Sequence, residues 1–295
     1  MAISVNNPHD KFFKSIMNEI NVAKAIISTF LSRDILNLID IDSLQHAKTN
    51  FVSEELKETF SDVVFSAKMK SKKEVFISFL LEHKSYPDIF TAVQVLFYLA
   101  SGYYSQYKNS KKLQVIIPLV FYHGKEKWEY KSMEELFEDV PKSIRRFIPT
   151  FDTVFLDLAD FSDSQLDALE NSLVSAILLL QKYALRPEEL AKKLHLIYSK
   201  MNSVNRERNF FREVIVYSLQ LIDIKKVEEA IKELPPVIKN KVMTAYETLI
   251  QQGEYKNTVK VILNGYKAGL SIKILATLTN LSESEVIEII QKHRK

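Results

Sequence analysis

The sequence predicts an α/β fold that is followed by an all-helical C-terminal region. Three observations support this prediction. Glycine and proline (5 and 8) make up only 13 of 295 residues, too few for the many turns of a β-sandwich or barrel. Runs of β-branched and aromatic residues, typical of strands, occur only before about residue 163. After that point the apolar residues repeat with a helical period.

The composition is that of a soluble globular protein, with 46% hydrophobic and 26% charged residues. The chain has no cysteine, which excludes disulfides, thiolate metal sites and thiol nucleophiles. We expect a cytoplasmic protein, since this usage is compatible with a reducing compartment. We expect neither a signal peptide nor a membrane span, because no apolar stretch approaches 18 residues. The net charge of +3 neither requires nor excludes a nucleic-acid partner.

The N-terminal half supplies the elements of the α/β core in order. Apolar residues of the segment 8–36 form one helical stripe, which Asn7 or Asp10 could cap. Two β-branched and aromatic runs follow, at 61–69 and 74–84. The short charged link KSKK between them predicts a β-hairpin.

A helix and two strands complete this core. The helix spans about 88–107, and Gln94 is expected on a mainly buried stripe with Phe90, Phe97 and Tyr98. The apolar run LQVIIPLVFYHG at 113–124 predicts a buried central strand, and 151–160 predicts another.

Every stretch after residue 163 carries helical periodicity, and Pro187 marks a plausible boundary between helices. We therefore expect an α/β domain at 1–185 and a helical region at 186–295. The aromatic and branched residues of this region exceed the needs of a small bundle, so we expect part of them to form a homodimer contact. The residues concerned are Phe210, Phe211, Ile215, Tyr217 and Leu221.

The last 30 residues predict two short helices joined by a turn at Asn280, with Ser271 and Ser282 as caps. This arrangement resembles a helix-turn-helix. The second helix is acidic in its first turns, however, where a recognition helix meets DNA. We favour packing or assembly over direct DNA reading.

Three residues of the predicted hairpin carry candidate chemistry. Asp62 lies near the start of the first strand, whereas Glu82 and Lys84 lie near the end of the second. Side chains alternate along a strand, so Glu82 and Lys84 share a face. Because the strands are antiparallel, Asp62 is expected beside Glu82. Two carboxylates and an ammonium thus converge at one end of an apolar hairpin.

Charge is costly in apolar surroundings unless it is offset, and a divalent cation would offset it. Carboxylate oxygens with water suit Mg²⁺, which can activate water and stabilise a phosphodiester. In that hypothesis Asp62 and Glu82 hold the metal and Lys84 positions water or neutralises phosphate. The alternative is an ordinary same-face ion pair between Glu82 and Lys84.

Four motifs strengthen the first interpretation: NPHDKFFKSIM, ETFSDVVF, FLLEHKSYPD and VFYHGKEKW. In this order they resemble the recombination-promoting nuclease family of YhgA-like transposases, within the PD-(D/E)XK nuclease superfamily. The resemblance covers roughly residues 7–185. It implies a restriction-endonuclease-like core, a mixed sheet flanked by helices, and a metal-dependent DNA endonuclease. Asp62, Glu82 and Lys84 would match the catalytic motif, in which many members carry Gln in place of the lysine.

Three further residues are accessory candidates. Asp10 opens the first helix within the His-Asp pair typical of the family, where a helix cap is the competing role. Gln94 could face the site or be a core amide with satisfied partners. His123 ends the central strand, where sites tend to lie, and a structural role is the alternative.

Lysines cluster on the hairpin turn and before the central strand, and these clusters could contact DNA phosphates or simply be solvated turns. The lysines are Lys70, Lys72, Lys73, Lys111 and Lys112.

Two functions remain open from the sequence. The first is a Mg²⁺-dependent DNA endonuclease that acts in recombination or on mobile elements. The second is a non-catalytic DNA-binding or assembly protein that retains the nuclease fold. A strand-transfer transposase is disfavoured, because we find no third acidic residue after a long insert.

Overall fold

The computed structural model describes residues 8–47, 63–71, 76–109, 113–201 and 208–293, with the backbone alone at 76–83 and 208–210. The described residues divide into two compact units, Met1–Ile238 and Lys239–Lys295.

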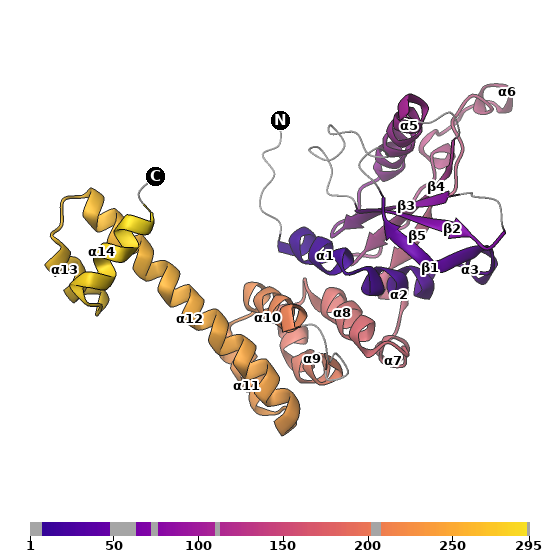
Figure 1. Cartoon of the computed structure of the whole chain (residues 1–295). Helices are drawn as coiled ribbons and strands as arrows, with labels where there is room; N and C mark the ends of the chain where they lie inside the picture. Colours follow the sequence, from indigo (N-terminus) through magenta and orange to yellow (C-terminus); the bar gives the residue numbers. More distant parts are fainter. Residues whose placement is uncertain (1–7, 48–62, 72–75, 110–112, 202–207, 294–295) are drawn as a thin grey trace. The chain divides into compact units, whose positions relative to one another are not determined.

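A five-stranded mixed sheet forms the centre of the first unit (Figure 1). The spatial order is β1-β2-β3-β4-β5, the same as the order along the chain. The first two pairings are antiparallel and the last two are parallel. The strands are β1 (Ile39–His46), β2 (Val63–Met69), β3 (Phe76–Lys84), β4 (Val115–Tyr122) and β5 (Val154–Asp157).

The helix α5 (Thr91–Asn109) connects the parallel strands β3 and β4 and packs on one face of the sheet. Its Val95 and Leu99 join Val120 and Tyr122 of β4 in one apolar cluster. This crossover is the usual way to join parallel neighbours, which a tight turn cannot connect.

N-terminal helices cover the other face. The helices are α1 (Pro8–Asn18), α2 (Ile20–Phe30) and the short α3 (Arg33–Leu38). The rings of Phe13 and Phe30 lie 5.0 and 6.4 Å from the ring of Phe121, between centroids. Phe121 follows Val120 in β4, so its side chain points to the opposite face from the α5 cluster.

Short helical segments follow β4 and β5, and longer helices complete the first unit. The short ones are η2 (Glu134–Leu136), α6 (Lys142–Arg145), η3 (Leu158–Asp160) and α7 (Asp163–Asp167). The longer ones are α8 (Ser172–Tyr183), α9 (Pro187–Lys200), α10 (Arg208–Leu221) and α11 (Ile224–Lys232). α8 packs against α2 and α9, and α10 packs against α1.

The second unit contains most of α12 (Pro236–Lys267), with α13 (Ile272–Thr279) and α14 (Glu283–Lys292). Its core joins Ile262 of α12 to Leu275 of α13 and Val286 of α14, all of them fully buried. Asn280 ends α13 in the left-handed conformation (φ 55°), and Ser282 closes a capping box with Glu285. The predicted turn and caps are confirmed.

The mixed α/β core and the helical C-terminal region are confirmed for the part of the chain that the structure describes. Two predictions about elements were wrong. The single helix over 8–36 is broken at Glu19, which adopts an extended conformation (φ −79°, ψ 104°), and again at Ser32, which caps α3. The edge strand β1 was missed, because IDIDSLQH is polar and only partly buried and therefore lacks a strand pattern.

The compact units do not follow the expected division at residue 185. Helix α9 packs on α8 through side chains that are completely buried, Leu190 and Leu194 among them. The division into domains at 185 stays a prediction about organisation, since the first compact unit extends to Ile238.

Three of the five residues expected at a homodimer contact are buried within their own unit. Phe211, Ile215 and Tyr217 are 5%, 0% and 1% exposed, because α10 turns them toward that unit, so the prediction was wrong for these three. Leu221 is half-buried, and the side chain of Phe210 lies outside the described part of the chain. The homodimer itself stays a prediction.

Across the described residues, no helix is both long and apolar enough to span a bilayer.

Candidate functional site

Lys84 ends β3 as a buried cation, and Gln94 and Asp88 are among the side chains that hold it. Only 8% of the residue is exposed, although its ammonium lies at the end of an apolar strand. Nζ donates a hydrogen bond to Oε1 of Gln94 at 2.6 Å and lies 3.7 Å from Oδ2 of Asp88. The amide of Gln94 also donates to Oδ2 of Asp88 at 3.2 Å. The three side chains form a closed triangle between β3 and α5.

Asp88 is a member of this triangle that the sequence analysis missed. Its Oδ1 accepts a hydrogen bond from the backbone N–H of Phe90 at 2.9 Å, so the residue also organises the start of α5. The signal was present in the sequence as an acidic residue between Pro87 and a helical pattern, four positions after Lys84.

For Glu82, the second residue of the predicted triad, the structure describes the backbone alone. Glu82 is a backbone position of β3 paired with Val120 of β4, and two residues before Lys84 it is on the same face. Asp62 lies outside the described residues. Val63, which follows Asp62 in the chain, pairs with Leu81, which precedes Glu82.

The remaining accessory candidates belong to the α1 side of the sheet. The buried ring of His123 lies 5.3 Å from that of His9, between centroids, and His9 begins α1 beside Asp10. The backbone N–H of His123 nevertheless donates to the carbonyl of Lys84 at 3.1 Å. The structure thus joins Gln94 to Lys84 through side chains and His123 to Lys84 through the backbone.

Tyr217 of α10 anchors this histidine pair. Its hydroxyl lies 2.6 Å from Nδ1 of His9, and its ring stacks on Phe12 with centroids 4.1 Å apart and planes at 3°. Burial raises the pKa of Tyr217, and the nearby charge of Asp10 raises it further, whereas a side-chain hydrogen bond with Gln181 lowers it. The phenol is therefore neutral, and α10 is tied to the start of α1.

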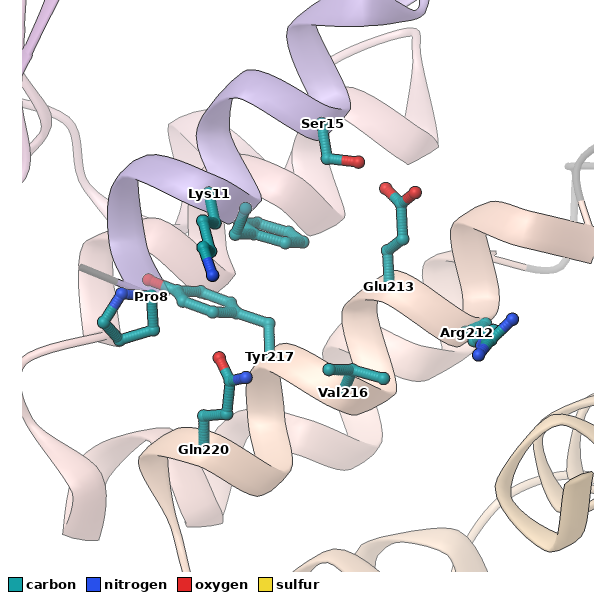
Figure 2. A pocket seen from close by; sticks show the side chains of 9 residues that line it. Pro8, Lys11, Ser15, Arg212, Glu213, Val216, Tyr217 and Gln220 are labelled. Atoms are coloured by element: carbon teal, nitrogen blue, oxygen red, sulfur yellow. The ribbon is translucent and has the colours of Figure 1, made fainter. Parts of the chain in front are cut away.

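A half-open cleft of about 430 Å³ runs between α1 and α10 beside this contact (Figure 2). Figure 2 shows Ser15 of α1 and Glu213 of α10 facing one another across it. Lys11 and Arg212 add two cations to the lining. This cleft is separate from the Lys84 triangle, which lies on the α5 side.

The stripe expected around Gln94 is buried only in part. Tyr98 is 3% exposed, but Phe90 and Phe97 are 59% and 54% exposed, and Gln94 is half-buried and turned to Lys84. The prediction was wrong for the two phenylalanines because both sides of α5 are apolar, and periodicity alone does not indicate which side meets the sheet.

The predicted DNA-contacting lysines are mostly outside the described residues. These are Lys72, Lys73, Lys111 and Lys112. Lys70 is described and exposed, and its ammonium donates to the carbonyl of Leu36 at 3.2 Å.

Among the residues and side chains that the structure describes, no group of three or more histidine or acidic residues could hold a metal ion. This finding does not cover Asp62 or the carboxylate of Glu82. The described residues do include a buried lysine on the face that Glu82 shares, with an amide and a carboxylate fixing its position.

The sequence was compared with known proteins. Residues 7–210 match the family described as "Putative transposase, YhgA-like". The recombination-promoting nuclease RpnA of Escherichia coli K12 is 23% identical over 287 residues, 95% of this chain and 96% of the relative. RpnD of E. coli O157:H7, another recombination-promoting nuclease, is 25% identical over 83% of this chain and 95% of its own.

A further relative carries a different description. RpnE of E. coli K12, named an inactive recombination-promoting nuclease-like protein, is 22% identical over 96% of this chain and 97% of its own length. No solved structure gives a significant match. The chain also resembles the recombination-promoting nucleases RpnA and RpnD. Since the family match spans more than half of the sequence, the chain belongs to the family described as "Putative transposase, YhgA-like".

Proposed function

We propose that this protein is a Mg²⁺-dependent DNA endonuclease that acts in recombination or on mobile elements. The observation that carries the proposal is the buried ammonium of Lys84, held by Gln94 and Asp88 at the end of β3. A buried cation costs free energy unless it is paired. Lys84 lies two residues after Glu82, in a chain related to named nucleases. We infer that its burial is maintained because the ammonium takes part in catalysis.

The fold supports a restriction-endonuclease-like core of the PD-(D/E)XK type. Glu82 lies in β3, which pairs antiparallel with β2, and Asp62 directly precedes β2 in the sequence. Helix α5 crosses from β3 to the parallel strand β4. Site residues that come from a strand end and from the following helix are held by two rigid elements, which favours precise positioning.

Asp62 and Glu82 would hold the metal through carboxylate oxygens, the ligands that Mg²⁺ prefers. When bound, the ion would supply Lewis-acid stabilisation of the phosphodiester and a more acidic water. Lys84 would direct its ammonium protons at that water or at the phosphate oxygens. Gln94 and Asp88 act on Lys84, because each restricts the rotamers that its long side chain can adopt.

The second candidate is a non-catalytic DNA-binding or assembly protein with the same fold. The similarity to RpnE, a relative named inactive, favours it specifically. The intact triad of Asp62, Glu82 and Lys84 favours the endonuclease over this second candidate, since a chain without catalysis has no chemical need to retain all three residues.

One experiment separates the two candidates. The purified full-length chain is incubated with supercoiled and with linear DNA, in the presence of Mg²⁺ or of EDTA. An endonuclease nicks or linearises the supercoiled DNA with Mg²⁺ only. Retarded but uncut DNA in both conditions supports the non-catalytic candidate. We also propose that the protein is cytoplasmic. Recovery of the nuclease activity in the cytoplasmic fraction of lysed cells would agree with this proposal.

A further inference from the structure

Helix α5 has an apolar stripe on its outer side as well as on the side that meets the sheet. The inner stripe contains Val95, Leu99 and Gly102, where a β-carbon on Gly102 would lie 2.6 Å from a methyl of Ile116. The outer stripe recurs at intervals of three and four residues. It consists of Phe90, Val93, Phe97, Ala100, Tyr104 and Tyr107, called here the outer seam.

Most of the large side chains of the outer seam are more than half exposed. The exposed fractions are 59% for Phe90, 54% for Phe97, 58% for Tyr104 and 74% for Tyr107. Alternating spacings of three and four over these positions are the pattern of a helix that packs along another helix. A helix that is apolar on both sides is expected to be covered on both sides.

The charge distribution of α5 indicates what covers the outer seam. No charged residue occurs from Ile89 to Tyr107, while Asp88 precedes this stretch and Lys108 follows it. A surface rich in aromatic residues and poor in charge is typical of the centre of a protein interface. Because the stretch is neutral, it can meet an identical stretch without repulsion between like charges.

The ends of α5 make the match with a second copy directional. In an antiparallel pair, the N-terminal end of one helix lies beside the C-terminal end of the other, so the two helix dipoles are opposed favourably. Asp88 is already paired with Lys84, so the dipoles and not a free carboxylate favour this direction. A parallel pair would align the two dipoles. An antiparallel pair has the two-fold symmetry of most homodimers.

The exposed area is large enough for a specific contact. Each aromatic side chain can bury roughly 150–250 Å², so the four exposed rings with Ile89 and Val93 offer on the order of 700 Å² per copy. A standard stable interface buries about 800 Å² per partner.

We propose that the outer seam binds the same seam of a second copy of this chain, with the two α5 helices antiparallel. Gln94 and the Lys84 triangle are attached to this helix, so the contact brings two candidate sites into one assembly. The dimer itself does not depend on the nuclease proposal, because it is argued from α5 alone.

The first test measures the mass of the full-length chain by light scattering and its dissociation constant by sedimentation. Phe97→Glu inserts a charge at the centre of the seam, and we expect it to raise the dimer dissociation constant at least about tenfold. Phe147→Glu is the matched control, because Phe147 is 74% exposed outside α5. A wild-type monomer at about 50 μM overturns the proposal, as does a dimer that Phe97→Glu leaves unchanged.

The second test uses the absence of cysteine from the sequence. In the antiparallel pair Val93 of one copy faces Tyr104 of the other. An oxidised mixture of Val93→Cys and Tyr104→Cys proteins should form disulfide-linked heterodimers, whereas each protein alone should not. Cross-linking of Val93→Cys to itself would indicate a parallel pair and would overturn the arrangement. Either result stands whether or not the protein cuts DNA.

Discussion

The ammonium of Lys84 and the amide oxygen of Gln94 are 2.6 Å apart, so a buried hydrogen bond joins the end of β3 to the first turns of α5. Asp88 completes the contact from the start of the same helix. The position of Lys84 is therefore set by a helix as well as by its own strand.

The acidic residues are tested by substitution. Asp62→Ala and Glu82→Ala should each lower Mg²⁺-dependent cleavage of supercoiled DNA by more than about 100-fold, because losing a ligand costs more than losing an outer-shell partner. Circular dichroism should remain unchanged, since removing one carboxylate relieves repulsion. Asp42→Ala, at a side chain that is 93% exposed, is the control. Wild-type cleavage by both variants would show that the assignment is incorrect.

Position 84 should tolerate glutamine better than alanine. Lys84→Gln keeps a donor and is expected to retain part of the cleavage rate, whereas Lys84→Ala removes it and should cut more slowly. Rates are compared under single-turnover conditions at saturating Mg²⁺. Equal rates for the wild type and both variants would leave Lys84 a purely structural ion-pair partner.

Gln94 is expected to act through Lys84. Gln94→Ala removes the 2.6 Å hydrogen bond of the ammonium and should lower the single-turnover rate about tenfold, with little change in DNA affinity. Gln94→Glu restores an acceptor and should recover most of the rate. Ser101→Ala, on the same helix, serves as the control. A loss of affinity at unchanged rate would instead identify Gln94 as a DNA contact.

Asp163 should make the fold sensitive to acid. Burial raises its pKa, but hydrogen bonds from Lys182, Lys193 and Tyr183 outweigh burial and hold the pKa well below its usual range. The carboxylate therefore stabilises the fold above the ordinary carboxyl pKa of about 4, and this stabilisation is lost as the pH falls toward the folded-state value. The nearest contacts are 2.7–2.9 Å long.

Asp163→Asn should lower the free energy of unfolding by about 1–2 kcal/mol at pH 7, a value reduced for partial exposure. The difference from the wild type should narrow at pH 3. Urea unfolding at both pH values measures it. Asp167→Asn, whose carboxylate pairs with Lys200 and is 49% exposed, should change stability by less than about 0.5 kcal/mol. A pH-independent difference would mean that Asp163 contributes through packing.

A chain that ends at residue 185 tests the domain boundary. The fragment 1–185 lacks α9, which covers α8 with fully buried residues that include Leu190, Leu194 and Ile197. Each such side chain is worth about 1.5–3 kcal/mol, so their loss consumes much of an ordinary stability of about 5–15 kcal/mol. We expect no cooperative thermal unfolding. A sharp transition in the fragment would instead support the boundary predicted from the sequence.

Local sequence signals predicted the local structure well. The runs 61–69 and 113–124 contain β2 and β4, because long β-branched stretches have few other ways to be buried. The capping box of Ser282 and Glu285 was likewise visible, since it needs only residues three apart. Edge strand β1 was not predictable in this way, because its polar sequence lacks a strand pattern and its pairing with β2 is a long-range contact.

The site was predictable only in its local part. The spacing of Glu82 and Lys84 follows from strand geometry, but the triangle around Lys84 depends on how α5 folds back onto the sheet. Periodicity placed Gln94 on a stripe that is only partly buried. It gave no role to Asp88, which precedes α5 and is identified only by its contacts with Lys84 and Gln94. The contact of Tyr217 with His9 spans 208 positions, and no local pattern could have indicated it.

The hydrogen bond from the N–H of His123 to the carbonyl of Lys84 uses atoms that every residue except proline possesses. The register of β3 with β4 is maintained in the same way. Substitutions can therefore accumulate along both strands while the main chain still delivers residue 84 to one point. Relatives that share only 22–25% of their residues with this chain can diverge widely in side chains under this constraint. Backbone hydrogen bonds can thus preserve the position of residue 84 while the surrounding side chains change during evolution.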